Sequence, residues 1–256
     1  MTYVNMTVEQ RGPLLLVGLN RPENRNAIHD PSIEEIRAVF AAPPAGTKVI
    51  VLFGHGPHFS AGLDLAEHSE RDAFEVMRHS QKWHQAFHNV QSGGLPVVAA
   101  LHGAVVGGGL ELAASTHVRV ADPSTIYALP EGSRGIFVGG GGSVRVARII
   151  GAGRMAEMML TGRSYGAVEG QAMGLSHHLT EAGQALPKAI ELAERIADNA
   201  PLSNYAIVNA LPRIADMAAQ DGLFTESLMA AMTQTSPEAH DRMRAFLEKR
   251  AAKAGG

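Results

Sequence analysis

Cysteine is absent from this sequence of 256 residues. Disulfide bonds, thiolate metal sites and a cysteine nucleophile are therefore excluded, and the composition suits a reducing compartment such as the cytoplasm. The sequence also lacks an uninterrupted apolar run of about 18 residues, the length that a membrane-spanning helix needs. Its first residues, MTYVNMTVEQRG, lack the basic stretch and apolar run of a secretory signal. We expect a soluble, cytoplasmic protein that does not associate with membranes.

An excess of positive charge is lacking too. The formal net charge is −3, from 22 Lys and Arg residues against 25 Asp and Glu residues. No global basic field would attract nucleic acid or an anionic membrane surface, although a local basic patch can still bind a phosphorylated ligand. A non-catalytic RNA-binding protein would show a basic stripe, so the charge argues against that class. A small-molecule substrate is the better hypothesis.

The residues that are present have the proportions of a globular protein, with 45% hydrophobic and 18% charged. Short apolar runs alternate with helical patterns, which predicts α/β units around a largely parallel core. Strands are expected over residues 3–9, 14–19, 48–53, 96–101, 117–121 and 126–129. Helices are expected from a cap at Asp30 to the Pro43-Pro44 pair, over residues 69–91 and over residues 107–115.

The carboxyl-terminal part has a different pattern. After about residue 140 no strand is predicted, and the last part of the chain has four helical segments, residues 186–199, 201–218, 221–233 and 237–253. We therefore divide the chain into a catalytic core over residues 1–190 and a helical region over residues 191–256.

Two glycine-containing segments follow the predicted strands. HFSAGLDL (residues 58–65) lies just beyond a buried strand, where small residues let the backbone approach a ligand. In LHGAVVGGGLE (residues 101–111), three glycines open a helix whose first N–H groups lack intrahelical partners and suit an anion. Taken alone, the first segment is more typical of an ordinary turn, and the second is equally typical of close packing against a strand.

The order of four segments is more specific. NRPENRNAI, HFSAGLDL, HGAVVGGGLELA and LPEGSRGIFVGGGGSVRVARIIG follow one another as in the crotonase superfamily, the enoyl-CoA hydratase/isomerase family, which the chain resembles over about residues 8–180. The resemblance implies a spiral of repeated ββα units with a carboxyl-terminal helical region used for trimerisation. It also implies acyl-CoA or enoyl-CoA thioester substrates, a role in acyl-CoA or fatty acid metabolism, and assembly as a homotrimer or hexamer. No cofactor is implied beyond the coenzyme A of the substrate.

The resemblance also assigns catalytic roles. The backbone N–H groups of Leu63 and Gly108 would form an oxyanion hole for the thioester carbonyl. Glu111 and Glu131 match the paired acids of hydratase-like relatives, with Glu111 as base and Glu131 as acid, although two close carboxylates titrate as a coupled pair. Without the resemblance, Glu111 would be read as a first-turn carboxylate facing the helix dipole and Glu131 as a solvated loop charge. Because relatives that catalyse other reactions often keep only one acid, the pair favours hydration.

Substrate contacts are implied at further positions. The loop residues expected to contact coenzyme A are Arg25, Ala27, Ala61, Asp64 and Leu65. For Arg25, a surface salt bridge is the simpler alternative. Residues 77–87, which include the only tryptophan, Trp83, fall where relatives line the acyl pocket, although ordinary packing of a helix face is the favoured explanation.

Some residues depart from the family pattern. Val138 stands where many hydratases have proline, and Arg134 is a charge beside the expected acid that could pair with Glu131 and hold it ionised. His84 and His88 have the i, i+4 spacing of a zinc site, but no HExxH motif or nearby carboxylate accompanies them, so no metal is expected. The residues predict an enoyl-CoA hydratase. An enoyl-CoA isomerase or a thioester hydrolase with the same oxyanion hole remains the alternative.

Overall fold

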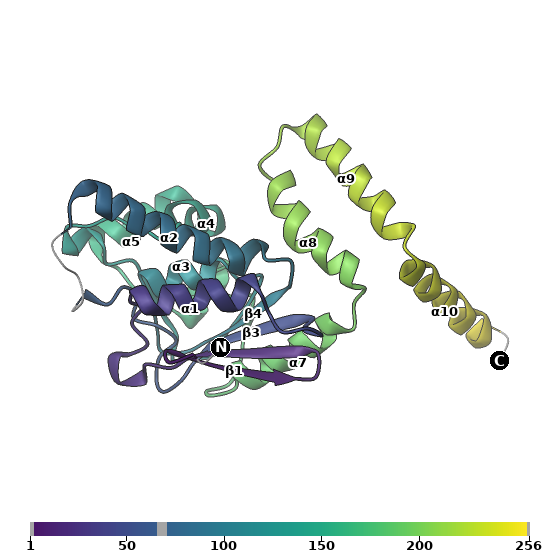
Figure 1. Ribbon diagram of the computed structural model, residues 1–256, viewed down its shortest axis with the longest axis horizontal. Coiled ribbons are helices and arrows are strands. Elements are labelled where there is room, and N and C mark those ends of the chain that lie inside the picture. The colour runs from purple at the N-terminus through teal and green to yellow at the C-terminus, as the bar shows by residue number, and fades with distance from the viewer. Residues whose placement is uncertain (1–2, 66–70, 255–256) are drawn as a thin grey trace.

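The computed structural model describes residues 3–65 and 71–254, and its α/β core is built on two β-sheets (Figure 1). The larger sheet contains, in spatial order, β1 (Met6–Arg11), β2 (Leu14–Leu19), β3 (Val49–Gly54), β4 (Val97–Leu101), β6 (Val118–Ala121) and β9 (His178–Leu179). β1 and β2 are antiparallel, and every other neighbouring pair is parallel. The smaller sheet has the order β5 (Ala104–Val106), β7 (Ile126–Ala128) and β8 (Tyr165–Gly166).

The central strands of the larger sheet are buried on both faces, which explains their continuous apolar runs. Alternate residues such as Leu15 and Ile50 belong to a core shared with α1 (Asp30–Ala41) and α2 (Ala73–Ser92). On the opposite face, residues such as Leu14 and Val49 pack against α7 (Ala185–Ala197), which contributes four buried alanines, Ala185, Ala189, Ala193 and Ala197. Their small side chains, four residues apart on one helix face, let α7 lie close to the sheet.

Shorter helices surround the second sheet and connect it to the carboxyl-terminal part. In chain order they are α3 (Gly108–Ala114), the 3₁₀ turn η3 (Gly132–Arg134), α4 (Gly142–Ile150), α5 (Ala152–Thr161) and α6 (Ala167–Ala172). Beyond α7, the chain continues as α8 (Pro201–Ile214), α9 (Ala219–Gln234) and α10 (Pro237–Ala254), and α9 and α10 extend away from the core (Figure 1). Large apolar side chains are exposed on these last three helices, namely Tyr205, Ile207, Leu211, Leu223, Phe224, Leu228, Met232, Met243, Phe246 and Leu247.

The α/β architecture predicted from the sequence is confirmed, and so are six strands and the helices around them, with ends shifted by a few residues. The expectation of no strand after residue 140 is wrong, because β8 and β9 pair there with earlier strands. Asp30 is the first residue of α1 and not its cap; its carboxylate contacts His79 and Arg71 instead. The predicted boundary at residue 190 falls inside α7, a helix that packs against the larger sheet.

None of the helices in the described part of the chain has both the length and the apolar character needed to cross a membrane.

Candidate active site

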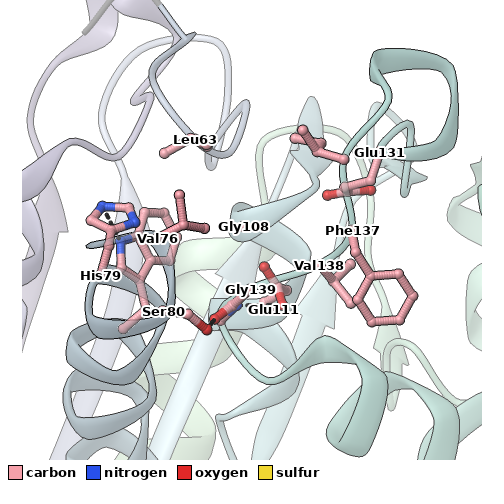
Figure 2. A pocket seen from close by; sticks show the side chains of 13 residues that line it. Leu63, Val76, His79, Ser80, Gly108, Glu111, Glu131, Phe137, Val138 and Gly139 are labelled. Atoms are coloured by element: carbon pink, nitrogen blue, oxygen red, sulfur yellow. Dashed lines mark hydrogen bonds between the residues drawn. The ribbon is translucent and has the colours of Figure 1, made fainter. Parts of the chain in front are cut away.

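A cavity of about 120 Å³ lies between α2, the start of α3 and the loop before α4 (Figure 2). Its walls are formed by Leu63, Val76, His79, Ser80, Trp83, Gly108, Glu111, Glu131, Ile136, Phe137, Val138, Gly139 and Gly140. The four residues predicted to carry the chemistry, Leu63, Gly108, Glu111 and Glu131, are therefore brought to one cavity from segments that are far apart in the sequence.

The backbones of Leu63 and Gly108 approach each other at this cavity. A Cβ atom on Gly108 would lie 3.5 Å from the nitrogen of Leu63. The turn before Leu63 needs a positive φ at Gly62 (+87°), and a Cβ there would lie 2.5 Å from the carbonyl oxygen of Val106. Among the described residues neither the Leu63 N–H nor the Gly108 N–H has an acceptor. The fold thus presents two neighbouring, unpaired backbone donors, an arrangement that can stabilise negative charge on a bound oxygen.

Hydrogen bonds of Asn26 and Ser60, which we call the Asn26 latch, hold the turn that carries the Leu63 N–H. The Ser60 hydroxyl donates to the carbonyl of Asn26 at 2.8 Å, and the Gly62 N–H donates to that hydroxyl at 3.2 Å. The buried Asn26 amide donates in turn to the carbonyls of His55 and His58, at 2.8 and 2.7 Å. Asn26 has φ +54°, a conformation that asparagine tolerates better than most residues. This role was not predicted from the sequence, where the third Asn of NRPENRNAI was the available signal.

Glu111 lies on the first turn of α3 and is almost fully buried. Its Oε1 accepts hydrogen bonds from the N–H groups of Gly140 (2.8 Å) and Gly142 (2.7 Å). A Cβ on either glycine would lie about 3 Å from this carboxylate, at 3.1 Å from Oε2 for Gly140 and 2.9 Å from Oε1 for Gly142. The glycine run of residues 139–142 therefore receives the Glu111 side chain. Burial raises the pKa of Glu111, while the two N–H donors and the Arg145 guanidinium act in the opposite direction.

Glu131 follows β7 and Pro130, and its carboxylate lies beside the start of α3, since a Cβ on Gly107 would be 2.9 Å from its Oε1. Its Oε2 is buried and has no hydrogen-bond partner among the described residues. The pKa of Glu131 is raised to about 7, mainly by burial and also by the nearby Glu111, although a backbone hydrogen bond and Arg134 act in the opposite direction. Arg134 forms no ion pair with Glu131 among the described residues, and its lowering effect on the Glu131 pKa is smaller than the opposite effect of burial. With an exposed fraction of 5%, Glu131 is not a solvated loop charge either.

The remaining walls are mostly apolar. Trp83 packs edge-on against Phe87, with ring centroids 5.5 Å apart, and a Cβ on Gly108 would meet its ring at 2.6 Å. Trp83 is therefore a wall directly beside the donor pair. From the predicted stretch 77–87, His79, Ser80 and Trp83 line the cavity. The opposite wall, Ile136 to Val138, was not predicted; its signal was an apolar triplet placed just before the glycine run.

The five residues expected to contact coenzyme A lie on two adjoining loops and do not line the cavity. The Ala61 N–H donates to the carbonyl of Arg25 at 3.0 Å, and the Asp64 N–H donates to that of Ile28 at 2.9 Å. The Asp64 carboxylate pairs with Arg21 at 2.9 Å, and both side chains are mostly buried, so Asp64 braces the two loops.

The other loop residues are more accessible. Arg25 is exposed and forms no ion pair with any described residue, so the surface salt bridge considered as its alternative is not found. Leu65 is exposed and Ala27 is half-buried, which leaves the outer surface of both loops accessible.

His84, one of the two histidines with zinc-like spacing, has its Nε2 3.3 Å from the Ser80 hydroxyl. In the described part of the chain, no group of three or more His, Cys, Asp or Glu side chains is arranged to hold a metal ion.

Comparisons with known proteins agree with this geometry. A family model described as enoyl-CoA hydratase/isomerase matches residues 9–255. A solved structure described as a "putative enoyl-CoA hydratase" from Rhodopseudomonas palustris CGA009 has a TM-score of 0.95 and 54% sequence identity, covering 97% of this chain and 96% of that one. The 2,3-dehydroadipyl-CoA hydratase of Escherichia coli (strain K12) is 32% identical over 249 residues, 96% of each chain. The short-chain-enoyl-CoA hydratase of Clostridium acetobutylicum is 29% identical, covering 98% of this chain and 97% of that relative.

The fold also matches solved relatives at lower identity. The enoyl-CoA hydratase structure from Bacillus anthracis has a TM-score of 0.90 at 29% identity, covering 96% of this chain and 97% of that one. The predicted crotonase fold with carboxyl-terminal helices is thereby confirmed, and in this chain it contains two sheets. This chain belongs to the enoyl-CoA hydratase/isomerase family of the crotonase superfamily.

Proposed function

We propose that this family member is an enoyl-CoA hydratase, a hydro-lyase that adds water across the α,β double bond of an enoyl-CoA thioester. One observation carries the proposal: two buried glutamates line the same small cavity as two backbone N–H donors that have no acceptor among the described residues. Hydration needs both parts, because the thioester carbonyl gains negative charge while one proton leaves water and another reaches Cα. An acid–base pair beside an anion-stabilising pair provides for each change.

The thioester oxygen would accept hydrogen bonds from the Leu63 and Gly108 N–H groups. As water adds to Cβ, electron density moves onto this oxygen, and each preorganised donor is expected to lower the barrier by about 3 kcal/mol. The side chain of Leu63 is a wall of the cavity, so in this scheme it limits the acyl group and leaves the hydrogen bond to the backbone.

The two glutamates would divide the proton transfers. The Oε1 of Glu111 already accepts two N–H groups, which stabilise its carboxylate anion. Glu111 therefore takes a proton from the water as the water oxygen bonds to Cβ. Glu131, whose raised pKa favours the protonated form near neutral pH, delivers a proton to Cα. The product is the 3-hydroxyacyl thioester, and proton exchange with solvent restores both glutamates. Because a catalyst accelerates both directions, the same groups catalyse dehydration.

Coenzyme A would lie along the two loops that carry Arg25, Ala27, Ala61, Asp64 and Leu65, with the exposed Arg25 available to a phosphate group. The acyl group would enter between α2 and the wall formed by residues 136–138. Phe137 and Val76 are 69% and 44% exposed at this edge, so an apolar acyl chain fits the entrance.

The exposed apolar residues of α8, α9 and α10 support assembly into a homotrimer or a hexamer, in which closed symmetry would cover them. Light scattering at micromolar concentration tests this part of the proposal. A stable monomer would contradict it.

The activity is tested by following the loss of the conjugated enoyl-thioester absorbance across a series of enoyl-CoA esters. Product analysis separates the alternatives within the family: an isomerase moves the double bond without adding water, and a thioester hydrolase releases free coenzyme A. A wild-type protein that only isomerises or only hydrolyses would refute the hydratase assignment.

A further inference from the structure

The loop that supplies N–H donors to Glu111 is itself held by an arginine. Arg145, on the first turn of α4, donates through Nη1 to the carbonyl of Gly140 at 3.1 Å. The same glycine donates its N–H to Glu111. Gly140 is thus held at both ends, by the guanidinium on its carbonyl and by the catalytic carboxylate on its N–H.

Arg145 is fixed from its other side by Gln91, near the end of α2. Its Nε donates to the Gln91 Oε1 at 2.7 Å. The Gln91 carbonyl accepts from Nε2 of His117 at 2.9 Å, and Nδ1 of His117 accepts the Val97 N–H at 2.9 Å. The guanidinium is therefore linked, through Gln91 and His117, to the beginning of the central strand β4.

The side chain that anchors Arg145, Gln91, is an uncharged amide. Gln91 accepts the guanidinium hydrogen bond without neutralising its charge, whereas Asp or Glu would form an ion pair. Arg145 has no carboxylate ion-pair partner among the described residues. The positive charge of this half-buried group therefore remains directed at Glu111, with which it interacts electrostatically.

We propose that Arg145 is a positioning residue for the hydration step. It holds the Gly140 carbonyl so that two N–H groups point at Glu111, and its unpaired charge, preserved by Gln91, keeps that carboxylate available as the proton acceptor. The effect on turnover rests on the proposed hydratase function, whereas the effect on the Glu111 carboxylate does not.

Three variants separate the effect of the Arg145 hydrogen bonds from the effect of its positive charge. Arg145→Met removes both, and we expect kcat to fall by about 10-fold to 100-fold with little change in KM, because a charged hydrogen-bonding group is lost outside the substrate contacts. The acidic limb of the kcat/KM profile should move to higher pH. Arg145→Lys keeps the charge but cannot bond both partners, so the limb should stay close to that of the wild type while kcat falls. Gln91→Glu keeps the geometry and neutralises the charge, so the limb should move upward as in Arg145→Met.

Arg148→Met is the matched control. It removes a positive charge from the same helix at an exposed position, where Arg148 pairs with Asp216 at 3.0 Å. We expect its acidic limb to coincide with that of the wild type. A shift equal to that of Arg145→Met would mean that net charge alone is responsible and would overturn the proposal.

A second readout does not depend on turnover. In protein labelled with ¹³C at the glutamate carboxyl carbons, the Glu111 signal is assigned by its loss in Glu111→Gln and is titrated by NMR. We expect a higher apparent pKa in both Arg145→Met and Gln91→Glu; identical titrations in these variants and the wild type would refute the inference. If Arg145→Met does not fold, Gln91→Glu still decides. If the wild type hydrates no enoyl-CoA, the proposed function fails while the NMR result stands.

Discussion

The two sides of the cavity bury their glutamates to a similar extent but supply the two carboxylates with different hydrogen-bond donors. Glu111 is 3% exposed and Glu131 is 5% exposed. On the Glu111 side, two backbone N–H groups and a guanidinium face the carboxylate; on the Glu131 side, one carboxylate oxygen has no partner among the described residues. Burial alone therefore does not assign acid and base. The supply of hydrogen-bond donors distinguishes the two residues.

The largest effect is expected from removing either carboxylate. Glu111→Gln and Glu131→Gln should each lower the hydration kcat by about 100-fold or more, the range of general acid–base catalysis, and should still bind the CoA ester. Steady-state kinetics on the best enoyl-CoA, with binding measured by calorimetry, tests this. Turnover close to that of the wild type in either variant would show that the two-glutamate mechanism is wrong.

A comparable loss is expected when the donor pair is displaced and both glutamates are kept. In Gly108→Val the new Cβ would collide with Trp83, from which it would be 2.6 Å away, so the N–H must move. We expect kcat to fall by about 100-fold or more, as when one oxyanion donor is removed, with a lowered melting temperature from overpacking. Gly153→Ala in α5 is the control, because no atom lies within 4 Å of a Cβ there. Unchanged kinetics of folded Gly108→Val would show that the thioester binds elsewhere.

A smaller effect on stability should separate the two glutamates. The pKa of Glu131 in the folded state, about 7, lies above its usual 4.5, so its contribution to stability is complete below pH 4.5 and is lost as the pH rises through 7. Glu131→Gln should therefore be more stable than the wild type at pH 8, by at most about 3 kcal/mol, and should match it at pH 4.5. Urea unfolding at the two pH values measures this difference. Glu111→Gln should gain less, because the amide loses two charge-assisted hydrogen bonds.

The smallest effect concerns Arg134. If Glu131 is the acid, kcat/KM falls as the pH rises through its pKa of about 7. Because Arg134 lowers that pKa, Arg134→Met should move the alkaline limb to higher pH, by less than about one unit for a partly solvated charge. A pH–rate profile from pH 5 to 9 provides the measurement. If the acidic limb moved to higher pH instead and the alkaline limb stayed in place, the assigned roles of the two glutamates would be reversed.

Much of the fold could be predicted from local patterns. The apolar runs at residues 48–53 and 96–101 became β3 and β4, and the glycine-opened helix became α3. Two short strands, β8 and β9, were missed because each has two residues and exists only through pairing with distant segments. A strand of two residues is too short to show a hydrophobic periodicity in the sequence.

The site was predicted in part for the same physical reason. Glu111, Glu131 and the two loops were identified by their motifs. The unpaired Glu131 oxygen, the Asn26 latch and the bond from Arg145 to Gly140 depend on tertiary contacts between segments 29 or more residues apart, or on the exact turn of a glycine loop. The adjacency of Arg134 in the sequence suggested an ion pair with Glu131, whereas burial, which the sequence does not show, has the larger effect on the Glu131 pKa.

The seven-residue segment from Ile136 to Gly142 has consequences for how this protein could diversify. Its first three residues present side chains to the cavity, and Gly140 and Gly142 donate their N–H groups to Glu111. Acyl selectivity thus depends on the side chains of this segment, whereas proton transfer depends on its backbone N–H groups. A library randomised at Ile136, Phe137 and Val138 should yield enzymes of altered acyl preference that remain active, whereas a single insertion in the segment would misalign both functions at once.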